Sequence, residues 1–263
     1  MRNFLRAVPD VLNSDDPKAV HRARVATRRM EENIAALFPK PYPKKIRKLR
    51  RALKRVRRYL GDWRNCDVVL TLMEKRRRRA RSGAKQSAWK LAERYVQDQR
   101  GSEISRARRK VAAVDLSEIS SPLNKLIERQ QLANPPINAD VEAVRDQWRS
   151  ALAAAEKSRD SRDLHAFRIA TKKLRYRLEL RRELGFDSSE LLAALKRLQR
   201  ALGNWNDRVV LDQMIAEAIG RPKILLREFN AARTLLTELE KDGRQRNIAM
   251  EEIFRAAASV PAG

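Results

Sequence analysis

The sequence predicts an all-α fold: two four-helix bundles related by internal duplication and pseudo-twofold symmetry. Three observations support this prediction. The chain has 263 residues, of which 35% are charged and only 8 are glycine, a composition that favours helix over strand. Apolar residues recur at intervals of three and four along most of the chain, and no segment reads convincingly as a strand. Two segments are also repeated in the same order in each half, which indicates duplication.

The first half contains four segments with helical periodicity. They span about residues 16–38, 44–60, 68–81 and 85–114. Asp16 is a suitable N-cap, and Pro17 fits the first helical position. Gly61 is expected to close the second helix in the left-handed conformation, and Asp67 is expected to cap the third.

The second half repeats this pattern. Helices are expected near residues 139–157, 163–184 and 187–203, with two or three more beyond, bounded by 220–222 and 242–243. Asp187 and Glu190 suggest a capping box, and Gly203 is expected to end the third of these helices. The prolines at 122, 135 and 136 mark the best linker, so the predicted repeats span residues 10–133 and 138–260.

The repeated segments carry the only two histidines of the chain. VHRARVATRRM begins at Val20 and LHAFRIATKKL begins at Leu164, so each histidine is followed by the same pattern of basic residues. A second pair, KRVRRYLGDWRNCDVVL and KRLQRALGNWNDRVVL, contains a Leu-Gly-x-Trp turn in each half. We expect Trp63 and Trp205 to pack over helix junctions and not to stack on bases.

The formal net charge of +26 is the most informative property of the composition. So large an excess of one sign repels itself and indicates a polyanionic partner: nucleic acid, an anionic membrane surface or inorganic polyphosphate. A single cysteine, Cys66, excludes an internal disulfide. The first residues lack the apolar core of a signal peptide, and no apolar run is long enough to span a membrane. The sequence therefore predicts a soluble cytoplasmic protein.

Basic residues form stripes on the two histidine helices, because spacings of three and four place side chains on one face. These stripes are His21, Arg24 and Arg28 in the first half and His165, Arg168, Lys172 and Arg175 in the second. Segment 44–58 is also basic and has no acidic residue. Cations at successive turns repel one another, so the pattern predicts an external anion. A bound polyanion would raise the histidine pKa values and strengthen binding below about pH 6.5. The arginines at 76 and 77 are expected to lie on a solvated face.

The doubled histidine motif resembles the CHAD domain, the conserved histidine α-helical domain. The resemblance lies in His-x-x-Arg-Val-x-x-Arg-Arg from His21 and His-x-x-Arg-Ile-x-x-Lys-Lys-Leu-Arg-Tyr from His165. The two Leu-Gly turns also resemble the turn motifs of that family, with Asn65 at a position where the family usually has Asp. The resemblance covers roughly residues 10–260. It implies two four-helix bundles, polyphosphate bound along a basic central groove or pore, and association with polyphosphate granules.

The resemblance also implies a set of polyphosphate-binding residues at the matching positions. In the first half these are His21, Arg24, Arg28, Arg29, Arg51, Lys54, Arg55 and Arg58. In the second half they are His165, Arg168, Lys172, Lys173, Arg175, Lys196, Arg197 and Arg200. No catalytic residue, metal ligand or cofactor is predicted.

Two other functions compete with polyphosphate binding. A polyphosphate or phosphate-ester hydrolase would use the histidines as acid or nucleophile, but the sequence shows no acidic metal-binding motif or phosphate-binding loop. Non-specific nucleic-acid binding is compatible with the charge, although no recognised DNA- or RNA-binding motif is present. We therefore predict a non-enzymatic polyphosphate-binding protein.

Overall fold

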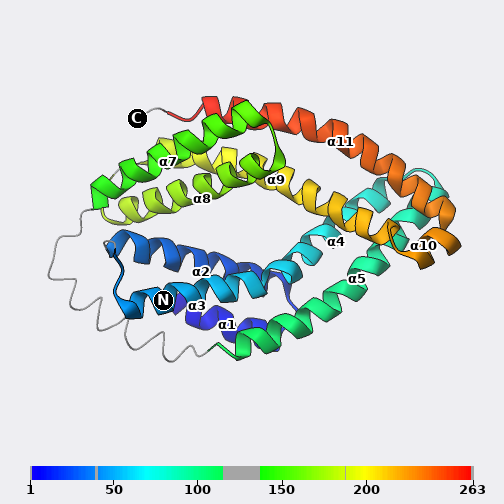
Figure 1. Cartoon of the computed structure of the whole chain (residues 1–263), viewed down its shortest axis with the longest axis horizontal. Helices are drawn as coiled ribbons and strands as arrows, with labels where there is room; N and C mark the ends of the chain where they lie inside the picture. Colours follow the sequence, from blue (N-terminus) through cyan, green and yellow to red (C-terminus); the bar gives the residue numbers. More distant parts are fainter. Residues whose placement is uncertain (1, 39–40, 115–136, 187, 262–263) are drawn as a thin grey trace.

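The computed structural model describes residues 2–38, 41–114, 137–186 and 188–261, and in these ranges every regular element is a helix (Figure 1). The helices are α1 Arg2–Asn13, α2 Pro17–Leu37, α3 Lys44–Tyr59, α4 Gly61–Arg79, α5 Gly83–Ala112, α7 Ile137–Ser158, α8 Ser161–Glu183, α9 Ser189–Ile219, α10 Pro222–Arg227 and α11 Phe229–Ala258. The predicted all-α class is confirmed.

The start of α2 confirms its predicted cap. The Asp16 carboxylate accepts a hydrogen bond of 2.9 Å from the backbone N–H of Lys18, and Pro17 opens the helix. An Asp side chain satisfies an amide that has no partner within the helix, and proline has no such amide to satisfy. The sequence did not predict α1, which precedes this cap and buries Val8 and Val11 against the first core.

The predicted roles of Gly61 and Asp67 are wrong. Gly61 is the first residue of α4 and has no positive φ, because the chain turns at Leu60, whose φ and ψ are −85° and 2°. The Leu60 side chain is fully buried and fixes this junction. Asp67 lies inside α4, where it is buried and accepts a 2.7 Å hydrogen bond from Arg100 Nε.

Two predicted breaks in the second half are also absent. Gly203 lies inside α9, which continues to Ile219, and the Asp242-Gly243 pair lies inside α11. Leu198, Leu202 and Trp205 form one buried row across Gly203, so packing offsets the roughly 1 kcal/mol cost of glycine in a helix interior. Glu190 lies in the first turn of α9, whereas Asp187 and the predicted linker prolines lie outside the described residues.

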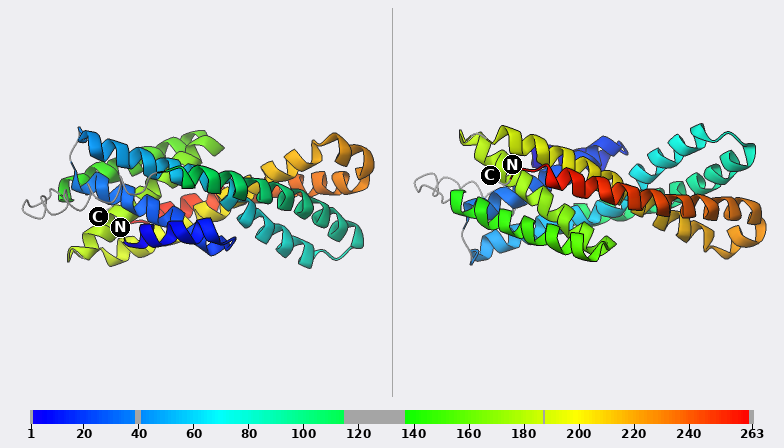
Figure 2. Two further views of the ribbon diagram at one scale, coloured as in Figure 1. Left: turned by 90° about the horizontal axis from the view of Figure 1, so that it is seen from below. Right: turned by 90° about the horizontal axis from the view of Figure 1, so that it is seen from above.

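Three hydrophobic cores hold the helices together. The first joins α1, α2 and α3 to the end of α5, and the second joins α7, α8, the first half of α9 and the end of α11. A third core contains Val69, Trp89, Leu211 and Leu235, so it joins α4 and α5 to α9 and α11. Figure 2 shows these four helices reaching the end of the molecule farthest from the chain termini. The two halves thus share a core, and the predicted repeat boundaries stay a prediction.

Candidate functional site

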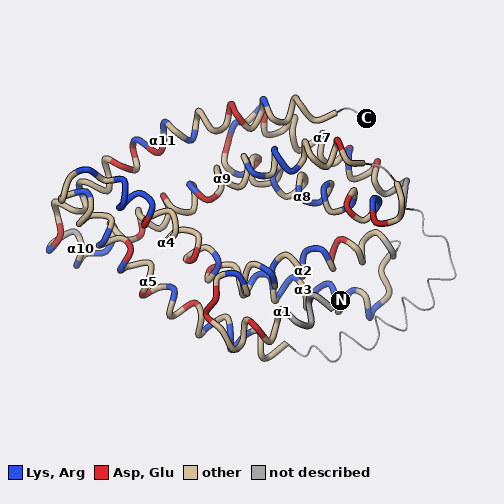
Figure 3. Tube along the Cα trace, turned by 180° about the vertical axis from the view of Figure 1, so that it is seen from behind, with Lys and Arg blue, Asp and Glu red and all other residues tan. Residues whose placement is uncertain are grey.

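Helices α2 and α8 pack against each other near the centre of the molecule (Figure 1). Two ion pairs cross their interface: Arg29 Nη2 lies 3.3 Å from Glu179 Oε2, and Arg177 Nη2 lies 3.9 Å from Glu32 Oε2. The two histidine helices, 144 positions apart in sequence at His21 and His165, therefore meet in space. Figure 3 shows Lys and Arg positions along α2, α3 and α8 around this centre.

Basic side chains from four helices, α2, α3, α4 and α8, influence one another where α2 meets α8. We define the central basic cluster as His21, Arg24, Arg28, Arg57, Arg64, His165, Arg168 and Lys172. Arg24 and Arg28 of α2 both repel Lys172 of α8, and Arg28 also repels Arg168. Because these repulsions cross between the two histidine helices, the stripes converge on one region.

The cluster is held in an electrostatically unfavourable state. Burial, together with the positive charges of Arg168, Arg28 and Arg24, lowers the pKa of Lys172 to about 6. Burial and the neighbouring arginines, Arg28 first, lower the pKa of Arg24 to about 10. The pKa values of Arg28 and Arg168 are lowered as well, again chiefly by burial. Loss of solvation and like charges both disfavour the protonated forms, and a nearby negative charge would favour them.

Both histidines lie at the exposed side of the cluster. Burial of part of each ring, followed by the repulsion of Arg64 for His21 and Arg168 for His165, lowers both histidine pKa values. The side chain of Asn206 from α9 is a hydrogen-bond partner of His165 and opposes this shift. The histidines are therefore mostly neutral at about pH 7 and able to gain protons when negative charge approaches.

Within the described residues, Arg57 is the cluster member that forms an ion pair with a carboxylate, that of Glu31. The carboxylates of Glu31 and Glu32 also oppose the lowering of the Arg28 pKa. Among the described residues, no ion pair is formed by His21, Arg24, Arg28, Arg168 or Lys172. Asp207 of α9 raises the pKa values of Arg168 and Lys172 only as a minor influence. The Nε of Arg168 is buried and has no hydrogen-bond partner within the described ranges. A buried donor without a partner costs about 1–3 kcal/mol, and an external oxygen atom would satisfy it.

Arg24 is positioned by the junction between α3 and α4. Its Nη1 donates a hydrogen bond of 2.6 Å to the backbone carbonyl of Arg57, in the last turn of α3. A Cβ atom at Gly61 would lie 3.3 Å from the same Nη1, which is closer than most Cβ contacts. The glycine of the first Leu-Gly-x-Trp turn thus makes room for a cation of the cluster and is not a left-handed cap.

Three of the predicted binding residues of the histidine helices have partners within the protein. Arg29 pairs with Glu179, and Arg175 lies 2.5 Å from the same carboxylate, with its guanidinium 4.4 Å from the ring centre of Tyr176. Lys173 donates a 2.6 Å hydrogen bond to Gln147 of α7. These contacts support the helix interfaces, so the three residues surround the cluster without belonging to it.

The residues predicted on α3 and α9 divide into two groups. Lys54 Nζ lies 3.5 Å from Glu31, a buried carboxylate that also pairs with Arg50 and Arg57. Six other predicted cations are exposed on their helices: Arg51, Arg55 and Arg58 on α3, and Lys196, Arg197 and Arg200 on α9. No described interaction ties these six to the histidines, so they are separate basic surface residues in the ligand-free protein.

Sequence reasoning missed Arg57 and Arg64. Arg57 faces Arg24 and Arg28 across the α2–α3 contact, and Arg64 lies near His21 and Arg24. Arg57 sits one residue from a predicted position, and Arg64 directly follows Trp63 in the turn that we interpreted as purely structural. Arg57 follows the predicted residue Lys54 by three positions and therefore lies on the same face of α3. This spacing could have identified it.

The expected solvated face at 76 and 77 is wrong. Arg76 pairs with the buried Asp242 of α11, and its guanidinium carbon lies 5.3 Å from the ring centre of Trp89. Arg77 Nε donates hydrogen bonds of 2.9 and 3.0 Å to Glu93 of α5. Both arginines therefore hold the third core together.

Trp63 and Trp205 pack as expected, with exposed fractions of 0% and 4%. Neither indole is available for stacking on a base. The guanidinium of Arg108 lies 5.6 Å from the Trp63 ring centre on the outer side of the first core. This arrangement removes the main structural argument for nucleic-acid recognition by these residues.

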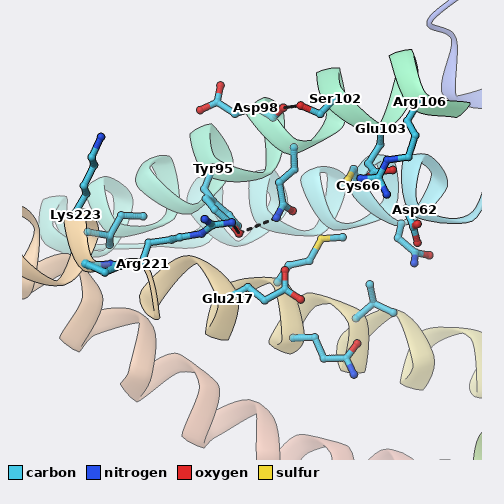
Figure 4. A pocket seen from close by; sticks show the side chains of 17 residues that line it. Asp62, Cys66, Tyr95, Asp98, Ser102, Glu103, Arg106, Glu217, Arg221 and Lys223 are labelled. Carbon is cyan, nitrogen blue, oxygen red and sulfur yellow. Dashed lines mark hydrogen bonds and ion pairs between the residues drawn. The ribbon is translucent and has the colours of Figure 1, made fainter. Parts of the chain in front are cut away.

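A pocket of about 990 Å³ lies away from the cluster, between α4, α5, α9 and α10 (Figure 4). Four carboxylates line it: Asp62, Asp98, Glu103 and Glu217. Arg106, Arg221 and Lys223 line the same pocket. The charges nearly balance, so the pocket lacks the basic excess that favours a polyanion. Burial, followed by the nearby carboxylate of Glu103, raises the pKa of Cys66 to about 11, so this thiol is protonated and unsuited to nucleophilic chemistry.

The described residues contain no group of three or more His, Cys, Asp or Glu side chains arranged to hold a metal ion. No helix in the described ranges is both long and apolar enough to cross a bilayer.

Comparisons with known proteins agree with this architecture. A family model described as the CHAD domain matches residues 1–216. The crystal structure of the CHAD domain from the plant Ricinus communis superimposes with a TM-score of 0.75 at 21% identity, covering 99% of this chain and 88% of that one. PptA from Streptomyces chartreusis gives a TM-score of 0.67 at 16% identity, covering 97% and 94%. A comparison with curated proteins found no match. At these identities the two structures establish the likeness of fold.

Proposed function

The chain belongs to the CHAD domain family, and from this premise we propose that it binds inorganic polyphosphate at the central basic cluster without catalysing a reaction. The observation that carries the proposal is the convergence of Arg24 and Arg28 with Arg168 and Lys172. Among the described residues, none of these four cations forms an ion pair with a carboxylate. Folding brings these cations together against their mutual repulsion. A polyanion with closely spaced negative charges would offset that repulsion.

The chemistry of the side chains fits a chain of phosphates. Arginine can donate two parallel hydrogen bonds to phosphate oxygens, and lysine supplies a compact charge. His21 and His165 flank the arginines on the exposed side and add N–H donors once they are protonated. A thin polymer with one charge per phosphate can contact α2 and α8 together, whereas duplex DNA is much wider than the separation of two packed helices.

The exposed cations of α3 and α9 extend this surface in the proposal. Arg51, Arg55 and Arg58 would attract the polymer beyond the cluster on one side, and the predicted cations of α9 would do so on the other. They contribute through long-range attraction that salt screens readily. The proposed cellular location is the cytoplasm, at polyphosphate granules.

The test compares two double variants that remove the same charge. Arg28→Gln with Arg168→Gln removes one cation from each histidine helix. Lys90→Gln with Arg94→Gln removes two exposed cations of α5, far from the cluster in sequence. Binding of long-chain polyphosphate is measured by fluorescence anisotropy over a range of salt concentrations. We expect the cluster variant to lose at least about tenfold in affinity and the slope against salt to decrease by about two.

Equal losses in the two variants would contradict a defined site and indicate diffuse attraction. Competition separates polyphosphate from nucleic acid: polyphosphate should displace duplex DNA at equal phosphate concentration, and DNA should fail to displace polyphosphate.

A test for catalysis measures the release of phosphate from long-chain polyphosphate with and without magnesium. Turnover that disappears in His21→Ala or His165→Ala would overturn the non-enzymatic proposal.

A further inference from the structure

The end of the molecule farthest from the termini carries an exposed apolar pair. Leu226 of α10 and Phe229 at the start of α11 have exposed fractions of 84% and 63%. Figure 2 shows α10 and the start of α11 at the distal end, well away from α2 and α8. Single exposed apolar residues are common on soluble proteins, but two large ones three positions apart, on either side of the junction between α10 and α11, are typical of an interaction surface.

Basic side chains flank this pair. Lys223 and Arg227 of α10 are exposed, and Arg233 is exposed one helical turn after Phe229. Glu228 is the only acidic residue from 221 to 233. We define the α10 tip as Lys223, Leu226, Arg227, Phe229 and Arg233. It combines large apolar side chains with cations, as interfacial segments that bind anionic bilayers do.

The alternatives fit this combination less well. Polyphosphate and other inorganic polyanions have no apolar part that would bury Leu226 and Phe229. A second copy of the chain would bring two cationic tips together in a protein whose net charge is +26, so charge repulsion opposes that contact. An anionic lipid surface satisfies both properties, because headgroups attract the cations and acyl chains accept the apolar side chains.

We propose that the α10 tip docks the protein peripherally on anionic lipid bilayers, with Leu226 and Phe229 inserted below the headgroups. The proposal is independent of polyphosphate binding, since the tip and the central basic cluster share no residue. Docking through the distal end leaves α2 and α8 accessible to a polyanion while the protein is on the membrane.

The first experiment reports insertion at one residue. All four native tryptophans are buried, with exposed fractions of 7% or less, so Phe229→Trp introduces an exposed indole. The full chain is mixed with vesicles of equal phosphatidylglycerol and phosphatidylcholine, with or without brominated acyl chains. We expect a blue shift and quenching by the brominated lipid, and neither with vesicles of phosphatidylcholine alone. Binding without quenching would show that another face contacts the vesicle and would overturn the proposal.

The second experiment measures the apolar contribution by vesicle sedimentation. Leu226→Ser with Phe229→Ser should weaken binding by at least about tenfold, because two large side chains no longer enter the bilayer. The matched control is Leu236→Ser with Ile248→Ser, which removes two exposed apolar residues elsewhere on α11. Equal binding by the tip variant and the parent would overturn the proposal. Unchanged polyphosphate affinity in the tip variant shows that the fold is intact.

Discussion

The guanidinium of Arg24 donates a hydrogen bond of 2.6 Å to the backbone carbonyl of Arg57. The bond ties α2 to the last turn of α3, where the carbonyl groups form the negative end of the helix dipole. It also fixes Arg24 beside Arg28 despite the repulsion between them. This hydrogen bond therefore stabilises a helix end and also holds a cation of the central basic cluster in place. A substitution can separate these two roles.

Arg24→Lys should separate these two roles. Lysine keeps the positive charge but cannot reproduce the guanidinium geometry, so the hydrogen bond to Arg57 is lost. We expect the free energy of unfolding to fall by about 1 kcal/mol, measured by urea denaturation. The slope of polyphosphate affinity against salt should stay unchanged, because the same number of charges meets the ligand. A reduced slope would show that Arg24 acts through its geometry and not mainly through its charge.

Lys172→Met should make the ligand-free protein more stable. Methionine has a similar length and replaces an amine whose protonated form is disfavoured in the folded protein by burial and by three arginines. At about pH 7 we expect the free energy of unfolding to rise by more than about 1 kcal/mol. Polyphosphate affinity should fall in the same variant. Thermal unfolding measures the first effect and anisotropy the second. A variant that is less stable and binds normally would place Lys172 outside the site.

The stability gain of Lys172→Met over the parent should decrease as pH rises. The folded pKa of Lys172 is about 6 and its ordinary value is 10.5, so the unfolded chain binds the extra proton between these values. Stability of the parent should therefore rise with pH across this window. In Lys172→Met this contribution is absent, and the curves of parent and variant should approach each other at the alkaline end. If the difference in free energy of unfolding between parent and variant stays constant across this pH window, the lowered pKa of Lys172 in the folded protein is contradicted.

The sequence predicted the helical class and the two histidine stripes because both depend on local periodicity. It did not predict that α9 and α11 continue through Gly203 and Gly243, because buried rows on both sides of a glycine outweigh its local cost. Likewise, Arg175 and Lys172 belong to one stripe of α8, but only coordinates show that Glu179 neutralises Arg175. Charge at a site depends on which carboxylates fold against it, and periodicity contains no such information.

Arg76→Ala should destabilise the third core. Arg76 pairs with Asp242, which is 6% exposed, and removal of the arginine leaves this carboxylate buried near Asp212. We expect a loss of about 2 kcal/mol in the free energy of unfolding, less than for a fully buried pair because Arg76 is partly exposed. Urea denaturation measures it. Arg79→Ala, an exposed neighbour, is the control and should change stability little; similar losses in both variants would contradict the assigned role.

Polyphosphate binding should take up protons. In the free protein the pKa values of Lys172, His21 and His165 all lie below their ordinary values. A polyanion at the cluster raises them, so at about pH 7 the complex holds more protons than its separate components. Affinity should consequently fall as pH rises from about 6 to 8.

Calorimetry in buffers of different ionisation enthalpy measures directly the number of protons taken up on binding. Lys172→Met should reduce that number, whereas the α5 variant Lys90→Gln with Arg94→Gln should leave it unchanged. Binding with no proton uptake would mean that the polymer contacts only the exposed cations of α3 and α9, where no histidine or shifted lysine lies.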